Sequence, residues 1–304
     1  MKTELDTLAT ALYVKTDDLL KASPHLAPWR PAVGIAPQLT DAELVTLAMM
    51  QAMLGFTSEA RWLRHAGSHL RHLFPYLPKQ PGYNKRLRKS AGLLRRAPGC
   101  WPPTPPCGAT TCGSWTPRRW NAAVHARPSN APTWPDGPST GTAPVTAASS
   151  GACGCTWCAP SRGLPVAFAL TGAKADERET LLDLLAAEPG LAADRPAQTL
   201  IGDKNYFGRD FEHELAEQDI RLLRPARKGE PERPGAPLFK PLRQVIESVN
   251  ETLKGQLDLE HRRARTPGGV VARVMQRILA LTTAIWHNDH TGQPVLRSLT
   301  AYDH

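Results

Sequence analysis

Two short motifs bring carboxylates and cations into positions where they could bind a metal ion or a phosphate. Asp203 directly follows the apolar run at residues 199–202, so its carboxylate is expected where a buried strand gives way to a loop. Arg243, Glu247 and Lys254 are four and seven residues apart, which places them near one face of a helix. Taken singly, Asp203 is equally typical of a turn, and the second motif of a surface ladder of ion pairs.

A third candidate is a basic cluster that could bind phosphates. Lysine and arginine displace the counterions that surround a nucleic acid, so clustered cations favour binding to its backbone. The alternative is a solvated helix face without a ligand. The cluster consists of Lys85, Arg86, Arg88 and Lys89.

The first 94 residues are expected to form helices. Leu5, Leu8 and Leu12 recur at helical spacing. Residues 40–43 form a capping-box pattern, and the apolar stretch after them stops at Gly55. A further helix is predicted from residue 58 to about residue 72.

The second half of the chain alternates between the two kinds of element, which favours an α/β core in layers. Strands are predicted at residues 164–170, 199–202 and 220–223, and helices at residues 177–187, 211–218, 242–257 and 270–285. The longest apolar run noted, residues 44–56, is too short to span a membrane, and no signal-peptide pattern opens the chain. We therefore expect a bacterial-type cytoplasmic protein that does not enter a membrane.

The segment at residues 95–163 has a different composition from its flanks. It contains no Leu, Ile, Met, Phe or Tyr, yet it holds all 6 Cys of the chain. It contains six Arg and one acidic residue, Asp136, which is a net charge of +5 out of the +9 of the whole chain. The high pI is therefore weak support for nucleic-acid binding.

Together, Asp203 within Gly-Asp-Lys and the Arg-x3-Glu-x6-Lys pattern of Arg243, Glu247 and Lys254 resemble the DDE-type transposases of bacterial insertion sequences. The resemblance covers residues 1 to about 94 and about 164 to 304. The tyrosine that the family has three residues before the arginine is Lys240 here. The family's fold would be a helical amino-terminal region, for DNA binding or dimerisation, followed by an RNase H-like α/β core.

The resemblance also implies a chemistry and a set of partners. In the family three carboxylates hold two Mg²⁺ (or Mn²⁺) ions, which bind both the attacking and the leaving oxygen of a phosphoryl displacement. Asp203 and Glu247 would be two of these catalytic metal ligands, and Arg243 and Lys254 would contact DNA. The partners would be the terminal inverted repeats and target DNA, handled by a homodimer on the nucleoid. The first catalytic Asp, expected on a strand before residue 164, is missing.

The composition of the 95–163 segment is typical of GC-rich coding DNA translated in the wrong frame. The codons of Trp115 and Thr116 are TGG and ACN, and the codon that straddles them is GAC, which encodes Asp. The hidden frame permits Val-Asp-Ser-Thr-Pro-Val-Glu across residues 114–121 and a second strand pattern across residues 152–158. We interpret the segment as frameshifted, with one shift near residues 95–98 and a compensating one near residues 161–163.

Three expectations follow for the chain. Residues 95–163 would be disordered and would contribute no packed sheet, so the α/β core at residues 164–304 would be incomplete. Metal binding would be weakened and catalysis by this copy impaired. The alternatives are a non-catalytic DNA-binding remnant that inhibits active copies, a functional Pro-rich linker, and a zinc module built on the six cysteines, of which only Cys155 and Cys158 have knuckle spacing.

Overall fold

The computed structural model divides the chain into two compact units, which we describe separately. The helical unit comprises residues 1–104 and 248–304, and the sheet unit comprises residues 105–247. The structure describes residues 2–31, 34–97, 111–115, 153–159, 164–165, 167–172, 175–188, 198–202, 204–231, 233, 244–245, 247–259, 266–294 and 299.

The helical unit is a bundle whose amino-terminal helices follow the predicted apolar faces. Leu5, Leu8 and Leu12 are all buried on the first helix. The second helix begins with the predicted capping box, in which the Thr40 hydroxyl accepts from the Glu43 N–H and the Glu43 carboxylate accepts from the Thr40 N–H. The elements are α1 (Lys2–Ala22), η1 (Pro24–Leu26), α2 (Asp41–Met53), α3 (Glu59–His69), α4 (Gln80–Lys89), α5 (Ala91–Arg96), the π-helical turn η3 (Thr252–Gln256) and α10 (Pro267–His290).

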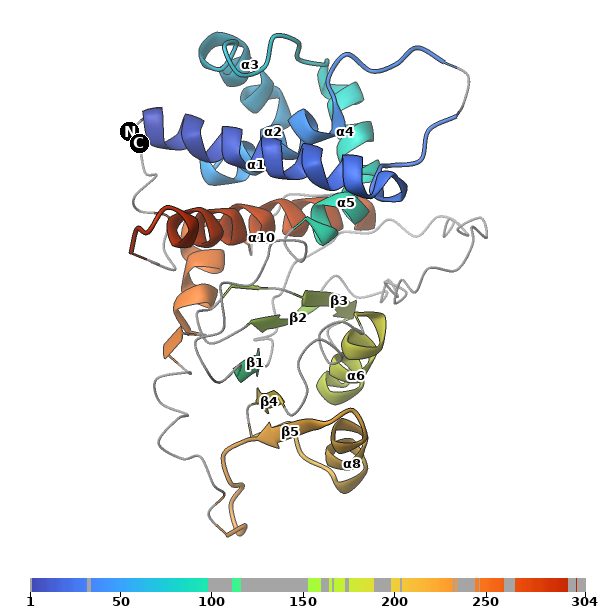
Figure 1. Cartoon of the computed structure of the whole chain (residues 1–304), viewed down its shortest axis with the longest axis vertical. Coiled ribbons are helices and arrows are strands. Elements are labelled where there is room, and N and C mark those ends of the chain that lie inside the picture. Colours follow the sequence, from blue (N-terminus) through green and yellow to red (C-terminus); the bar gives the residue numbers. More distant parts are fainter. Residues whose placement is uncertain are drawn as a thin grey trace. The chain divides into compact units, whose positions relative to one another are not determined.

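Helix α10 is the central element of this bundle. It packs against α1, α2, α4 and α5, although the sheet unit separates it from them in the sequence (Figure 1). A buried polar cluster fixes three helices to one another, because the Gln51 side-chain oxygen accepts from the Tyr83 hydroxyl at 2.8 Å and from the Gln276 amide at 3.1 Å. A buried polar group that keeps its partners specifies one arrangement of the helices.

Within the part of the chain that the structure describes, residues 268–290 form one helix long and apolar enough to cross a membrane. This run is longer than residues 44–56, which the sequence analysis took as the longest. Most of it, 83%, is buried inside the bundle, as expected for the core helix of a globular unit.

The sheet unit contains a five-stranded mixed sheet in the order β3-β2-β1-β4-β5. Strand β1 runs antiparallel to β2 and parallel to β4, β2 is antiparallel to β3, and β4 is parallel to β5. Only β2 therefore runs against the other four. The strands are β1 (Thr111–Trp115), β2 (Cys153–Ala159), β3 (Ala167–Gly172), β4 (Gln198–Ile201) and β5 (Ile220–Leu223).

Two of these strands come from the segment that we expected to be disordered. Strands β1 and β2 lie within residues 95–163 and pair with each other, with Trp115 opposite Trp157. The side chains of Trp157 and Cys158 are buried. The expectation that this segment contributes no packed sheet is wrong for these two strands, because ladder hydrogen bonds come from the backbone and Thr, Trp and Cys fit a pleated, half-buried surface.

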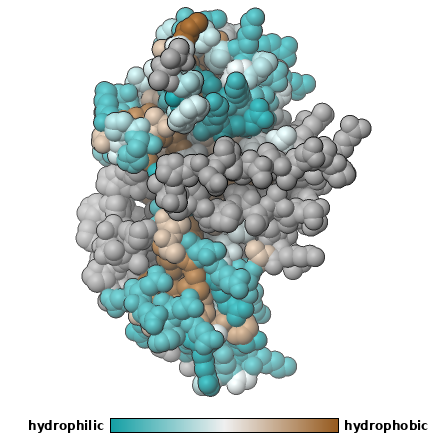
Figure 2. All heavy atoms as spheres, turned by 90° about the vertical axis from the view of Figure 1, so that its right-hand side faces the viewer, coloured by the Kyte–Doolittle hydropathy of each residue, from teal (hydrophilic) through white to brown (hydrophobic). Residues whose placement is uncertain are grey.

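Two helices cover one face of the sheet. Helix α6 (Glu177–Ala187) and helix α8 (Arg209–Glu217) share a core with the strands, formed by Leu181 and Leu184 of α6, Leu215 of α8 and Leu200 of β4. Figure 1 shows both helices on the same side of the strands. Figure 2 shows a hydrophobic strip among the mostly hydrophilic side chains of this unit. The α/β class predicted from the sequence is confirmed.

The boundaries of the two units differ from those predicted. We expected residues 1–94 and residues 164–304 to form separate regions, but residues 248–304 belong to the helical unit. The physical reason is that α10 buries its apolar surface against α1 and α2.

Candidate functional site

The carboxyl ends of β4 and β5 lie side by side, and Asp203 follows β4 in the sequence. Both strands run in the same direction, and the Gly202 N–H donates to the Leu223 carbonyl at 2.9 Å, which ties the two strand ends together. The loop after β5 therefore begins beside the residue that precedes Asp203. Ligands of open α/β sheets bind outside the carboxyl ends of the strands. Asp203 itself lies outside the described residues.

A tyrosine anchors the segment that follows Asp203. Tyr206 is fully buried and packs beside Phe211, with ring centroids 6.1 Å apart. Glycine before Asp203 suits this packing, because a Cβ on Gly202 would lie 3.1 Å from the Tyr206 ring and would require the ring to shift by a few tenths of an ångström. Gly202 and Tyr206 together fix where the chain leaves β4.

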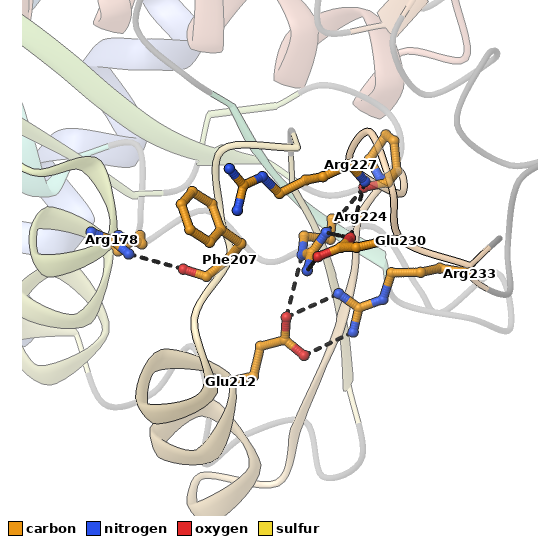
Figure 3. Close-up of polar contacts among 8 residues, drawn as sticks. Arg178, Phe207, Glu212, Arg224, Arg227, Glu230 and Arg233 are labelled. Carbon is orange, nitrogen blue, oxygen red and sulfur yellow. Dashed lines mark hydrogen bonds and ion pairs between the residues drawn. The ribbon is translucent and has the colours of Figure 1, made fainter.

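Phe207, next in the chain, is held by two arginines. Its carbonyl accepts from Arg178 Nη1 at 3.0 Å, and the Arg178 guanidinium lies 5.2 Å from the centre of its ring. The guanidinium of Arg227, from the loop after β5, lies over the same ring at 3.6 Å (Figure 3). Arginine over an aromatic face is an attractive arrangement in which the cation can remain exposed.

The loop after β5 is fixed by a network of two arginines and two glutamates (Figure 3). Arg224 is buried, and its guanidinium donates to Glu230 at 2.7 and 3.1 Å and to Glu212 at 3.3 Å. Arg233 donates to both oxygens of Glu212, at 2.9 and 2.8 Å. Two positive and two negative charges thus balance within the network.

The arginines of the network, and Arg178 nearby, lower the pKa of three carboxyl groups. Hydrogen bonds from Arg224 lower the pKa of Glu230 to about 2, and those from Arg178 lower the pKa of Asp176 to about 2. Arg233 lowers the pKa of Glu212. All three groups therefore hold fewer protons in the folded chain than in the unfolded chain.

We expect acid to destabilise the sheet unit through these groups. Their contribution is complete above the unfolded pKa of 4.5 for Glu230 and 3.8 for Asp176, and it is lost as the pH falls through the folded value of about 2. Thermal unfolding followed from pH 6 to pH 2 should show a falling midpoint below about pH 4.5. Glu230→Gln should flatten this profile, whereas Glu214→Gln, on the exposed side of α8, should leave it unchanged.

The helix predicted to carry the second motif is described in part. Arg243 lies outside the described residues. Glu247 is exposed on a helical stretch, and Lys254 is half-buried in η3. A π-helical turn has a different period from an α-helix, so the seven-residue spacing from Glu247 to Lys254 no longer assures one face. Their common face stays a prediction.

The basic cluster lies on α4, and one of its members has a structural role. Arg86 donates to the Leu39 carbonyl at 2.6 Å and to Asp41 at 2.9 Å, and so holds α4 against the start of α2. Lys85, Arg88 and Lys89 are exposed. The Lys89 ammonium lies 5.8 Å from the ring centre of Trp29, whose side chain is 77% exposed.

Part of the chain matches a known protein family. Residues 154–283 match the family model of the transposase DDE domain. The chain carries a DDE-type transposase domain. The resemblance inferred from Asp203 and Glu247 is thereby confirmed, and at the level of the family it implies DNA binding, strand cleavage and strand transfer. No curated protein and no solved structure matches the chain.

DDE transposases use divalent metal ions, and the sequence analysis names two carboxylates as candidate ligands for them. Asp203 and Glu247 are two carboxylates with the hard oxygen donors that Mg²⁺ prefers. Strand β1, which runs parallel to β4 beside it, reads Thr-Cys-Gly-Ser-Trp and has no carboxylate. Among the described residues no group of three or more His, Cys, Asp or Glu could hold a metal ion.

Sequence reasoning missed the arginines around Phe207. It named no candidate site residue between residues 204 and 242. The available signal was the density of charge after β5, with Arg224, Arg227, Lys228 and Glu230 within seven residues. Which of these charges pair and which one remains exposed depends on the fold.

Proposed function

We propose that this chain is an impaired transposase of a bacterial insertion sequence, with an RNase H-like core that has lost its first catalytic carboxylate. The mixed five-stranded sheet with helices on one face supports such a core. Asp203 and Glu247 are the surviving metal ligands in this proposal, and Mg²⁺ or Mn²⁺ would bind weakly. Two carboxylates would not complete the metal pair, so strand cleavage by this chain would be weak or absent.

The observation that carries the proposal is the register between β1 and β4. Thr111, Cys112 and Gly113 pair with Thr199, Leu200 and Ile201 in parallel. Counting on by two residues assigns Trp115 to the position opposite residue 203. The Asp codon hidden in the other frame straddles codons 115 and 116, so the extrapolated register and the hidden codon support the same position for the missing carboxylate.

The two strands of the segment also support a frameshift. The hidden-frame strand patterns cover residues 114–121 and 152–158, and strands β1 and β2 occupy residues 111–115 and 153–159. A pair of compensating frame changes alters the side chains but keeps nearly the same number of residues between the flanking elements. The topology can then persist while the catalytic side chain is lost. The nucleotide sequence tests this directly, because stop codons in the alternate frame would contradict it.

DNA binding without catalysis is the second function that we propose, and the exposed cations of α4 support it. Lys85, Arg88 and Lys89 have no carboxylate partner among the residues that the structure describes. Trp29 beside Lys89 offers an exposed ring on which an unpaired base could stack. A chain that binds the inverted repeats, as a homodimer on the cytoplasmic nucleoid, would inhibit active copies.

We expect the triple variant Lys85→Gln, Arg88→Gln, Lys89→Gln to lose most of its DNA affinity. Each phosphate contact contributes about 0.9 to the slope of log K against log salt, so the slope should fall by about 2 to 3. Fluorescence anisotropy with a labelled duplex that carries the ends of the element measures both quantities. Lys21→Gln, which removes an exposed cation paired with Asp17 on α1, is the control. An unchanged slope in the triple variant would exclude α4 as the DNA-binding surface.

The zinc-module alternative has a separate test. Elemental analysis of the purified chain should find no stoichiometric zinc if the segment is frameshifted. One zinc per chain, lost together with folded structure upon chelation, would contradict the transposase-remnant proposal for this segment.

A further inference from the structure

We propose that Arg227, stacked on Phe207, is a phosphate contact for the DNA strand that enters at the carboxyl ends of β4 and β5. This inference rests on the proposed function, since it assigns a residue to DNA recognition by the same sheet edge. The contacts of Arg227 with Phe207 and Glu230, in the loop after β5, support it.

The pairing of two strand ends positions Arg227. The backbone bond from Gly202 to Leu223 brings the start of its loop beside the end of β4. Phe207 comes four residues after Asp203, and its ring lies directly beneath the Arg227 guanidinium, at 3.6 Å (Figure 3). The cation is thus fixed to the segment that continues from the surviving carboxylate.

The charge of Arg227 distinguishes it from the arginines around it. Every other arginine in Figure 3 has a carboxylate partner: Arg178 pairs with Asp176, Arg224 with Glu230, and Arg233 with Glu212. Arg227 is exposed and its guanidinium has no carboxylate partner within the described part of the sheet unit. The positive charge therefore remains available to an anion from solution.

Hydrogen bonds hold the loop that carries Arg227 in a tight turn. The Arg227 N–H donates to Glu230 at 3.0 Å, and the Glu230 N–H donates to the Arg227 carbonyl at 3.0 Å, which closes a tight turn. Gly229 has a φ of 89° in this turn, a conformation that favours glycine. Since Glu230 is itself bound by the buried Arg224, the guanidinium is presented in one place before DNA arrives.

Arginine suits this role because its planar group can stack on an aromatic ring and still donate hydrogen bonds to phosphate oxygens from its edge. Lys204 and Lys228 are exposed on the two loops that meet here and add to the positive potential. A single-stranded or distorted DNA end is the class of ligand that such an edge would take, with the backbone phosphate as the group recognised.

The test measures the binding of a labelled DNA duplex of mixed sequence that carries a single-stranded end to the full chain at several salt concentrations. Arg227→Gln should raise the Kd about tenfold and lower the salt slope by about one. Arg227→Lys should restore the slope but only part of the affinity, because the charge returns without the stacked plane. Phe207→Leu should keep the slope and weaken binding a few-fold, since the cation is no longer held in place.

The matched control is Arg221→Gln, which removes an exposed cation from β5 that lies outside the loop. Its Kd should change by less than about twofold. Binding by Arg227→Gln that equals that of the unaltered chain, or an equal loss in Arg221→Gln, would overturn this inference and leave the proposed function standing. Failure of the unaltered chain to bind any DNA would overturn both. Thermal unfolding of Arg227→Gln should match that of the unaltered chain, because Arg227 is exposed.

Discussion

A chain translated in the alternate frame between codons 97 and 162 is expected to cut DNA ends in the presence of Mg²⁺, whereas the present chain is not. The restored strand would place an Asp at residue 115 or 116, where the register with β4 assigns the position opposite residue 203. Loss of an outer-shell partner of a metal ligand costs about 10- to 100-fold in activity, so regaining a ligand itself should raise cleavage by at least about a hundredfold. Gel analysis of cleaved ends measures it.

The control for this experiment is the frame-restored chain with its new Asp changed to Asn. It shares every other restored residue and should return to the activity of the present chain. Equal cleavage by the Asn variant would show that the restored sheet, not the carboxylate, was limiting. Full cleavage by the present chain would refute the impairment altogether.

Replacing Arg224 by Met should destabilise the sheet unit markedly. The guanidinium is buried and makes hydrogen bonds to Glu212, to Glu230 and to the Pro225 carbonyl. Removing one member of a fully buried ion pair costs 3–5 kcal/mol, but these carboxylates are about one-third exposed and can regain water. We expect a loss of about 2 kcal/mol in the free energy of unfolding, measured by urea denaturation.

Arg221→Met is the matched control for Arg224→Met, because it makes the same change three residues earlier on an exposed position of β5. Its unfolding free energy should stay within about 0.5 kcal/mol of that of the unaltered chain. A double variant with Glu230→Gln should be less destabilised than the sum of the two single variants, since both remove the same contact. Simple additivity would mean that the network does not act as a unit.

The sequence predicted helices and strands correctly where short local patterns, such as helix caps and apolar spacing, determine them. The capping box of Thr40 and Glu43 begins α2 as expected. Helix α6 has the predicted bounds Glu177–Ala187, and strand β5 the predicted bounds Ile220–Leu223. Caps and apolar periodicity involve residues that are close in the sequence, so the bounds of these elements can be predicted without knowledge of the fold.

What sequence could not reveal depends on contacts between distant parts of the chain. The helix at α10 was predicted, but its place in the bundle depends on packing against α1 and α2, more than two hundred residues away. Arg86 was taken as a DNA contact because its charge is visible, while its bonds to Leu39 and Asp41 are not. Strands β1 and β2 were dismissed on side-chain composition, although strand pairing uses the backbone.

The late position of α10 has a consequence for how the chain comes to be made. Because α1, α2, α4 and α5 pack on a helix that is synthesised last, the bundle cannot close while the ribosome is still translating the sheet unit. A single uncorrected frame change would alter every residue of α10, and the helices that pack on it would lose their buried apolar contacts. In the proposed frameshift, the second, compensating change would preserve the bundle while catalysis is lost, and any truncated product that stops before α10 should be cleared by proteases rather than persist as a repressor.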